Sequence, residues 1–359
     1  MLPEINDCRR ILIVKLSSIG DVVMTTPVAK VLRNAFPDSY IAWAVDDKSK
    51  DVLVGNPYVD EVIVWNRRSN SNSRLGRTVG FLSGLAELGP KLRARRFDVA
   101  IDFQGLFRSA LVTRLCGARC RVGYDNAREG ATMFYDMHLP SRQLRVRGPQ
   151  QYLNMLQVLD IFSEDLDMYM PIGEDDRAFA QGFIAHAAPE AASRNKRVVA
   201  LCPATTWPQK HWAEEGWAHL ADVLASEHDA LPVFLGSPAD IGLVDRILGL
   251  TSCEAINAAG KTTLKQAAAI IEQSQVTIAV DTGLMHIALA LDRPTVGIFG
   301  PTRWRHLTGK ETFAAVVKEF PCMPCMRHPT CKRFECMKAI HPEDVLAAAS
   351  RLLKWKSNE

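Results

Sequence analysis

The sequence predicts an α/β protein made of two doubly wound domains. Its 359 residues suffice for about two domains. Eight short, β-branched apolar runs fall into two clusters, and helical patterns separate the runs. Apolar strands that alternate with helices are typical of parallel sheets covered on both faces. We therefore expect two such sheets.

The expected strands occupy residues 11–14, 41–45, 62–65 and 99–101 in the first half, and residues 198–201, 231–235, 276–280 and 295–299 in the second. Between the clusters, a helical pattern over residues 152–159 precedes Pro171, where we place the boundary. This predicts domains over 1–171 and 172–340. Residues 341–359 begin as a typical helix with Pro342, and we expect that helix to pack back toward the first domain.

The formal charge of +3 hides an asymmetry between the halves. Residues 1–150 contain 23 Lys/Arg against 15 Asp/Glu, a net charge of +8, which leaves −5 for residues 151–359. Part of the basic excess lies in residues 66–80, whose Arg, Asn, Ser and Gly content predicts a mobile loop. A basic first half favours an anionic partner such as a phosphorylated lipid, a membrane surface or nucleic acid, although a solvated cationic face is an equal alternative.

The cellular compartment is expected to be the cytosol. The start of the sequence has no pattern of an export signal, and no apolar run approaches the length of a membrane span. The nine cysteines are therefore expected to be reduced thiols.

Three segments place polar residues where an expected strand gives way to a helix, which is where doubly wound sheets bind ligands. The first contains Lys15, Ser17 and Asp21 in Lys-Leu-Ser-Ser-Ile-Gly-Asp, and a helix start is expected near Thr25 or Thr26 and Pro27. Asp21 fits either a helical cap or a ligand-facing carboxylate, and its neighbours favour the latter.

The second and third segments suit an anionic ligand. Thr205 and Thr206 with Lys210 offer two hydroxyls and a cation, which can bind a diphosphate. After Asp281, the backbone amides of Thr282, Gly283 and Leu284 are expected at a helix N-terminus, with His286 one turn into the helix.

Other motifs allow alternative interpretations. Gly260-Lys261-Thr262 followed by Asp281 after an apolar strand resembles a phosphate-binding loop of an NTPase, but the loop has one glycine where phosphate wrapping favours several. Cys322, Cys325, Cys331 and Cys336 could hold zinc or an iron-sulfur cluster, but they lack a second C-x-x-C, and three prolines favour an ordered surface loop. We expect no bound metal.

Five ordered motifs together resemble the lipopolysaccharide heptosyltransferases of glycosyltransferase family 9, most of all the heptosyltransferase II type, which has a similar Cys-rich tail. These motifs are K-x-S-S-I-G-D-V-x-x-T-x-P at 15–27, Asp-Phe-Gln-Gly-Leu-Phe-Arg-Ser at 102–109, Thr-Thr with Lys-His-Trp at 205–212, Asp-Thr-Gly-Leu-Met-His at 281–286 and Gly-Ile-Phe-Gly-Pro-Thr at 297–302.

The resemblance implies a GT-B fold, in which two Rossmann-like domains face each other across a cleft. The first domain would bind the acceptor and the second ADP-heptose. It implies an inverting, metal-independent heptosyl transfer with no cofactor, in which Asp21 is the general base and Lys210 stabilises the departing ADP. The expected donor site is Thr205, Thr206, Lys210, Asp240, Asp281, Thr282, Gly283, Leu284 and His286, although Asp240 fits a helical cap equally well.

The implied acceptor is anionic, namely the Kdo-lipid A or heptosyl-Kdo-lipid A core at the cytosolic face of the inner membrane. The candidates for binding it are Lys15, Ser17, Arg67, Arg68, Gln104, Arg108 and Arg121, with Arg74, Arg77 and Arg119 as further cations. We expect a monomer that is peripheral to the membrane. An NTPase, or a basic nucleic-acid-binding protein, is the alternative function; few aromatics lie among the arginines, so no nucleic-acid partner is expected.

Overall fold

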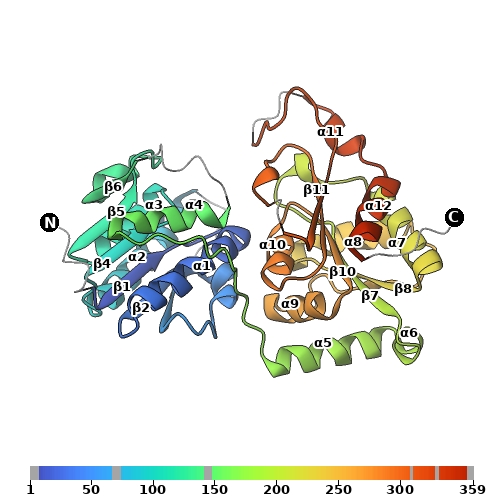
Figure 1. Ribbon diagram of the computed structural model, residues 1–359, viewed down its shortest axis with the longest axis horizontal. Helices are drawn as coiled ribbons and strands as arrows, with labels where there is room; N and C mark the ends of the chain where they lie inside the picture. Colours follow the sequence, from blue (N-terminus) through green and yellow to red (C-terminus); the bar gives the residue numbers. More distant parts are fainter. Residues whose placement is uncertain (1–7, 67–73, 141–147, 308–309, 328–330, 354–359) are drawn as a thin grey trace. The chain divides into compact units, whose positions relative to one another are not determined.

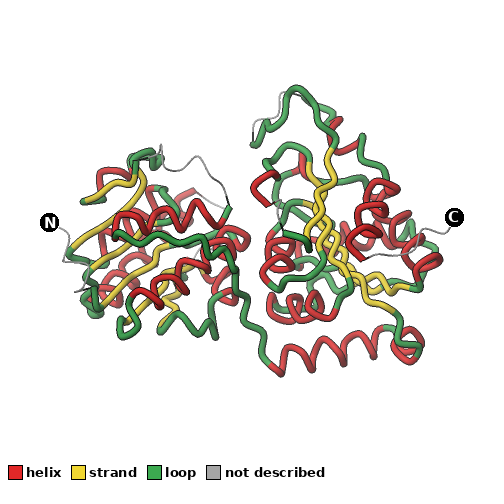
Figure 2. The backbone as a smooth tube through the Cα atoms, viewed as in Figure 1, coloured by secondary structure: helices red, strands yellow, loops and turns green. Residues whose placement is uncertain are grey.

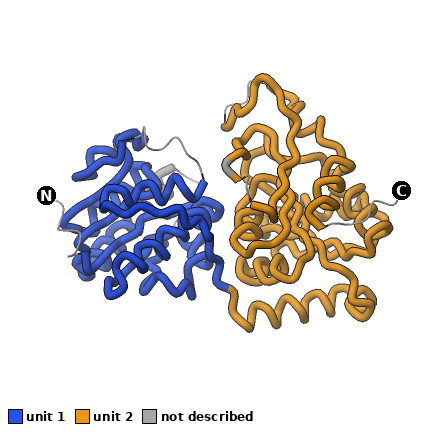
Figure 3. Tube along the Cα trace, viewed as in Figure 1, with its two compact units in different colours: residues 1–171 blue, residues 172–359 orange. Residues whose placement is uncertain are grey.

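The computed structural model describes residues 8–66, 74–140, 148–307, 310–327 and 331–353, without the side chains of 74–78 and 306. The chain divides into two compact units, residues 1–171 and 172–359 (Figure 3). Each unit contains its own six-stranded sheet. Within the described residues, no helix is long and apolar enough to cross a membrane.

The first unit is a parallel sheet with helices packed on it (Figures 1 and 2). Its strand order is β3-β2-β1-β4-β5-β6. The strands are β1 (Arg10–Val14), β2 (Tyr40–Asp46), β3 (Glu61–Trp65), β4 (Val99–Asp102), β5 (Cys120–Tyr124) and β6 (Met137–Leu139). The helices are α1 (Ile19–Ala35), α2 (Arg74–Arg93), α3 (Phe107–Leu115) and α4 (Pro149–Leu153), with 3-10 turns η2 (Asp47–Val52), η3 (Ala131–Phe134) and η5 (Asn154–Leu159).

Alternating side chains of these strands are buried on both faces of the sheet. Leu12 and Val14 of β1 join a core with Leu88 of α2 and Val112 of α3. The side chains between them, such as Ile13, point to the opposite face and are also fully buried. Burial on both faces explains why the strands appear in the sequence as continuous apolar runs.

The second unit repeats this topology with the order β12-β11-β10-β7-β8-β9. Its strands are β7 (Arg197–Cys202), β8 (Ala230–Phe234), β9 (Ile256–Asn257), β10 (Val276–Val280), β11 (Thr295–Phe299) and β12 (Phe313–Val317). Its helices are α5 (Glu174–Ala187), α6 (Pro189–Ser193), α7 (Glu214–His228), α8 (Ile241–Leu248), α9 (Leu264–Gln273), α10 (Gly283–Ala290), α11 (Glu335–Lys338) and α12 (Pro342–Leu353), with 3-10 turns η6 (Pro208–Lys210), η7 (Pro238–Asp240) and η8 (Arg305–Leu307). In Figure 1, α9 and α10 lie on one side of this sheet and α7, α8 and α12 on the other.

The C-terminal helix α12 is part of the second unit. Its apolar side chains Val345, Ala348 and Ala349 are buried in the same core as Val296 and Ile298 of β11. The apolar face of this helix is thus buried on the second sheet, and its packing toward the first domain stays a prediction.

The eight expected strands are all present, and four further strands lie toward the sheet edges. Two of the additional strands, β5 and β6, contain polar residues or glycine, and β9 has only two residues. The fourth, β12, has the sequence Phe-Ala-Ala-Val-Val, which does not distinguish a strand from a helix. Pairing with a neighbouring strand decides these segments more than their own composition does.

Helix α1 begins earlier than expected, at Ile19 rather than near Thr25, and Pro27 lies inside it. The start is fixed by Ser18, whose backbone N and Oγ both donate to the Asp21 carboxylate, at 3.2 and 2.9 Å. Pro27 has no N–H for the carbonyl of Val23, and the Thr26 hydroxyl donates to that carbonyl instead, at 2.7 Å. The helix therefore continues through the proline.

The segment expected to be a loop over residues 66–80 is partly helical, since α2 begins at Arg74. Residues 67–73, with Arg67 and Arg68, lie outside the described residues. Further along α2, a glycine allows close packing: a Cβ at Gly84 would lie 2.7 Å from the Trp65 indole nitrogen. A small residue there lets α2 approach β3.

In both sheets the strand order reverses at one central position, between β1 and β4 in the first and between β7 and β10 in the second. At such a switch point the loops that follow the two strands diverge to opposite faces and leave a crevice for ligands. The segments after β1 and β4, and after β7 and β10, contain most of the predicted site residues.

Candidate active site

Asp21 lies in the first turn of α1, directly after β1, and is held from two directions. Ser18 donates two hydrogen bonds to its Oδ2, and the Tyr152 hydroxyl donates to its Oδ1 at 3.1 Å. Tyr152 is 4% exposed and belongs to α4, which packs on α1. The carboxylate is therefore both a helix cap and a group held in one orientation.

Lys15 is a buried cation behind this carboxylate. Only 5% of the residue is exposed, its Nζ donates to the Phe103 carbonyl at 3.2 Å, and it lies 4.7 Å from the centre of the Tyr152 ring. Burial lowers the pKa of Lys15, while the charges of Asp21 and Asp102 oppose that shift. Lys15 is thus placed to act on the charge of this cluster more than to contact a ligand directly.

The segment after β4 supports the Asp21 loop. Gln104 accepts hydrogen bonds from the backbone N of Leu16 and of Ser17, both at 3.1 Å. The fully buried Asp102 accepts from the Tyr135 hydroxyl at 2.7 Å, and burial raises the pKa of Asp102. The Gln104 side-chain oxygen, predicted to contact the acceptor, therefore holds the loop between β1 and α1.

The predicted acceptor cations differ in position. Arg108, at the start of α3, donates to the Ser17 hydroxyl at 2.7 Å and so joins the cluster. Arg121 is near the beginning of β5 and forms a two-pronged ion pair with Asp136 at 2.8 and 2.5 Å. Arg119 is largely exposed and 3.7 Å from Asp98. Of these three arginines, the structure brings Arg108 alone to the Asp21 cluster.

In the second unit, the segments after β7 and β10 meet. The Lys210 ammonium donates to the Asp281 backbone carbonyl at 2.9 Å and to its carboxylate at 3.0 Å. The Thr205 hydroxyl donates to the same carbonyl at 3.3 Å, and Thr206 is exposed. The second and third sequence motifs, 71 residues apart, thus form one site.

Asp281 is ionised by its surroundings. Burial favours its neutral form, but the interaction with His286 and the charge of Lys210 outweigh burial and hold the pKa of Asp281 well below its usual range. His286 is buried, with its Nε2 3.8 Å from the carboxylate. Lys210, Asp281 and His286 therefore lie together behind the start of α10.

The start of α10 provides amides for an anion. Thr282 is the N-cap residue, and within the described residues the backbone N–H groups of Thr282, Gly283 and Leu284 make no hydrogen bond. Such groups carry the positive end of the helix dipole. The Asp240 carboxylate, in contrast, accepts from the Ser237 backbone N and Oγ at 2.8 and 2.6 Å, so it caps η7, which was the alternative for this residue.

The sequence did not indicate two aromatic residues of these clusters. Tyr152 is one apolar position in a helical pattern, and only the fold places it 3.1 Å from Asp21. Trp207 lies 4.6 Å from the Lys210 ammonium, measured to the ring centre. Its position two residues after Thr205 was the one feature of the sequence that could have placed Trp207 in this cluster.

The NTPase alternative does not fit the topology. Lys261 is exposed and follows β9, which is an edge strand, whereas Asp281 follows β10, and β7 and β8 separate the two strands. Helix α9 begins at Leu264, after the loop has ended, so its amides do not wrap a phosphate next to Lys261. The sheet order therefore separates the two halves of that motif.

Within the part of the chain that the structure describes, the four tail cysteines form no disulfide, and Cys336 is buried whereas Cys322 is exposed. Burial and the neighbouring thiols raise the pKa of Cys336. Within the described residues, no group of three or more His, Cys, Asp or Glu side chains is arranged to hold a metal ion. Asp165 and Asp167 instead pair with Lys30, at 2.7 and 3.5 Å.

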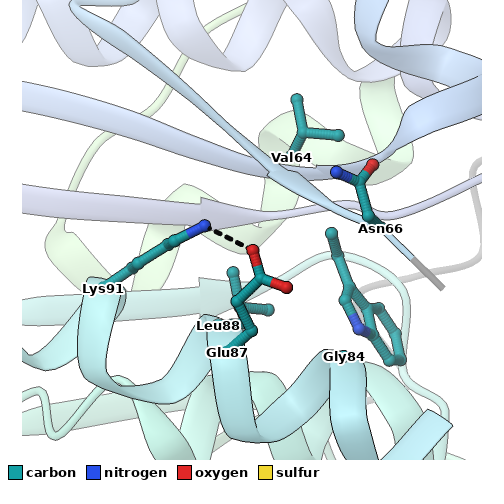
Figure 4. A pocket seen from close by; sticks show the side chains of 7 residues that line it. Val64, Asn66, Gly84, Glu87, Leu88 and Lys91 are labelled. Carbon is teal, nitrogen blue, oxygen red and sulfur yellow. Dashed lines mark hydrogen bonds and ion pairs between the residues drawn. The ribbon is translucent and has the colours of Figure 1, made fainter. Parts of the chain in front are cut away.

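A shallow hollow between β3 and α2 contains none of the predicted site residues (Figure 4). It is lined by Trp65, Gly84 and the ion pair of Lys91 with Glu87, whose atoms are 2.8 Å apart. The two switch points are therefore better candidates for the active site than this hollow.

The known proteins to which this chain is similar are heptosyltransferases. The model of "Glycosyltransferase family 9 (heptosyltransferase)" matches residues 85–335. Lipopolysaccharide heptosyltransferase 1 of Pseudomonas aeruginosa is 31% identical over 89% of this chain and 86% of its own length. Lipopolysaccharide heptosyltransferase 2 of Escherichia coli is 26% identical over 82% and 83%. The expected preference for the second type is therefore not supported by sequence identity.

Among solved structures, Escherichia coli heptosyltransferase WaaC with ADP-2-deoxy-2-fluoro heptose is similar to this chain. The TM-score is 0.66 at 25% identity, over 94% of this chain and 98% of that one. The fold of this chain is accordingly GT-B, like that of the related heptosyltransferase structures.

Proposed function

The chain belongs to glycosyltransferase family 9, the heptosyltransferases, and on that premise we propose that it transfers L-glycero-D-manno-heptose from ADP-heptose to the inner core of lipopolysaccharide. The acceptor is Kdo-lipid A or heptosyl-Kdo-lipid A. The observation that carries this proposal is the presence of an oriented carboxylate at one switch point and a cation with free helix amides at the other.

The second unit is suited to bind the donor. Lys210, the Thr205 hydroxyl and the first amides of α10 all lie after adjacent strands β7 and β10. A diphosphate can accept hydrogen bonds from such groups without a metal ion. The names of two relatives and the ligand of WaaC support ADP-heptose as the donor.

The first unit is suited to activate the acceptor. The Asp21 carboxylate takes the proton of an acceptor hydroxyl while that oxygen forms a bond to the anomeric carbon of the heptose. The bond from that carbon to the β-phosphate oxygen breaks on the opposite face, and ADP leaves with the electron pair. This single displacement inverts the configuration of the anomeric carbon.

Departure of ADP places negative charge on the β-phosphate. Lys210 and the amides of Thr282, Gly283 and Leu284 stabilise that charge because they are already held in place before reaction. Asp281 and His286 keep Lys210 in position and complete the donor site. No divalent cation and no cofactor is required by this scheme.

The acceptor is anionic, and the net charge of +8 on residues 1–150 supports its binding to the first unit. Arg108 is the arginine best placed for an acceptor phosphate or carboxylate, since it reaches Ser17 of the Asp21 loop. We place the reaction at the cytosolic face of the inner membrane, where the protein works as a peripheral monomer.

The test is a transfer assay with defined acceptors. The protein is incubated with ADP-heptose and either Kdo-lipid A or heptosyl-Kdo-lipid A, with and without EDTA, and products are identified by mass. We expect one acceptor to gain a single heptose, with inverted anomeric configuration by NMR and no effect of EDTA. Absence of transfer to both acceptors would refute the proposed function, and loss of activity in EDTA would refute its metal independence.

A further inference from the structure

In the proposed donor site, the charge of Lys210 is not available in full to a ligand. Lys210 is paired with the ionised carboxylate of Asp281 at 3.0 Å, so these two charges largely cancel. A nucleoside diphosphate leaves with more than one negative charge. A second cation without a carboxylate partner would therefore contribute strongly to binding and to leaving-group stabilisation.

Arg327, in the Cys-rich segment between β12 and α11, meets this description. Its guanidinium carbon lies 5.0 Å from the centre of the Trp207 ring, and the Lys210 ammonium lies 4.6 Å from the same centre. The two cations are therefore less than 10 Å apart. Arg327 is exposed, and within the described residues it forms no ion pair.

The backbone beside Arg327 is fixed to the donor site. The side chain of Gln209, buried next to Lys210, donates to the Met326 carbonyl at 3.1 Å. The Met326 backbone N donates to the Pro301 carbonyl at 2.9 Å. The backbone of Met326, directly before Arg327, is thus held at both its carbonyl and its N–H.

We propose that Arg327 is the second cation of the donor site and binds the diphosphate of the nucleotide sugar, and then of the departing nucleoside diphosphate. Trp207 holds both cations against its indole ring, which leaves the edge of the Arg327 guanidinium available to phosphate oxygens. The role of the Cys-rich segment is to position this arginine. The inference rests on the proposed function, since it requires that the Lys210 site bind the donor.

The test compares ADP with AMP, because Arg327 is expected to contact the diphosphate and not the nucleoside. Dissociation constants for both nucleotides are measured by calorimetry for the wild type, Arg327→Ala and Arg327→Lys. In Arg327→Ala we expect the ADP constant to rise about 10- to 100-fold, as for loss of a charge-assisted hydrogen bond. The AMP constant should change less than about threefold, and Arg327→Lys should restore part of the ADP affinity.

Arg305→Ala is the matched control. Arg305 also lies on an indole, 5.6 Å from the centre of the Trp304 ring, but its guanidinium is paired with Glu319 at 2.7 Å. This variant should bind ADP as the wild type does.

Unchanged ADP affinity in Arg327→Ala, or equal losses for ADP and AMP, would overturn the inference while leaving the proposed function intact. Failure of the wild type to bind ADP at all would overturn the proposed function and this inference with it. Because Arg327 is exposed, the thermal midpoint of unfolding should be the same in all variants.

Discussion

Replacement of Asp21 by asparagine separates its catalytic role from its structural one. In the wild type, Ser18 donates two hydrogen bonds to Asp21 at 3.2 and 2.9 Å, and the Tyr152 hydroxyl lies 3.1 Å from Oδ1. The amide oxygen of asparagine can accept both hydrogen bonds from Ser18, and its NH2 group then faces the Tyr152 oxygen. The start of α1 is therefore retained. What is lost is the negative charge and the ability to take a proton.

The expected loss of rate follows from general-base catalysis. Such a base contributes about 10²- to 10⁴-fold, which corresponds to about 2.7–5.4 kcal/mol in activation free energy. Stability should change much less, by about 0.3–1 kcal/mol for loss of a charge near a helix N-terminus. ADP affinity should be unchanged, because the contacts expected for ADP are made by the second unit.

The assay measures turnover at saturating ADP-heptose and acceptor, the dissociation constant of ADP and the free energy of unfolding. Asp176→Asn is the matched control: Asp176 occupies the same third position of α5 and accepts from the Gly173 backbone N at 3.2 Å. It should retain wild-type turnover. Turnover of Asp21→Asn within about threefold of the wild type, with the protein folded, would refute the assignment of the base.

Three further variants test the supporting structure. Tyr152→Phe removes the hydroxyl that orients the base, so we expect turnover to fall about 3- to 10-fold with unchanged ADP affinity, a loss of about one hydrogen bond. Lys210→Met removes the cation that helps keep Asp281 ionised, so the pKa of Asp281 should rise and the unfolding free energy should fall less between pH 4 and pH 2 than in the wild type. Gly123→Ala should destabilise the protein by about 1–3 kcal/mol in urea unfolding, since a Cβ there lies 2.2 Å from a packed tyrosine ring, whereas Gly182→Ala in the open face of α5 should not destabilise it.

Each of these expectations has a contrary outcome. If Tyr152→Phe lowers ADP affinity as much as turnover, the hydroxyl does not act through the base. The sign for Lys210→Met follows from linkage: a carboxyl whose folded pKa lies below its unfolded value of about 3.9 stabilises the protein above that pH and loses this contribution as the pH falls through the folded pKa. An equal or steeper fall of the unfolding free energy between pH 4 and pH 2 in Lys210→Met would contradict the ion pair of Lys210 with Asp281. Equal stabilities of the two glycine variants would contradict the packing at Gly123.

The sequence predicted the central strands and several of the residues that lie at the two switch points. All four strands that flank the switch points, β1, β4, β7 and β10, are buried on both faces, and such strands appear as continuous apolar runs that local pattern alone can reveal. The polar segments that follow them had to meet at the carboxyl edge of a parallel sheet. Asp21, Lys210 and Asp281 were predicted on that basis and on family resemblance, and their chemical roles are still predictions.

The tertiary structure decided what these residues contact. Asp21 meets Tyr152, which is 131 residues away, and Lys210 meets Asp281 across 71 residues. It also placed the Gln104 side-chain oxygen on the backbone of the loop between β1 and α1, and paired Arg121 with Asp136. Hydrogen bonds and ion pairs of this kind depend on which strands are neighbours, and no short window of sequence contains that information. The sequence by itself therefore determined the scaffold and the chemical groups available, whereas the order of the strands determined which groups act together.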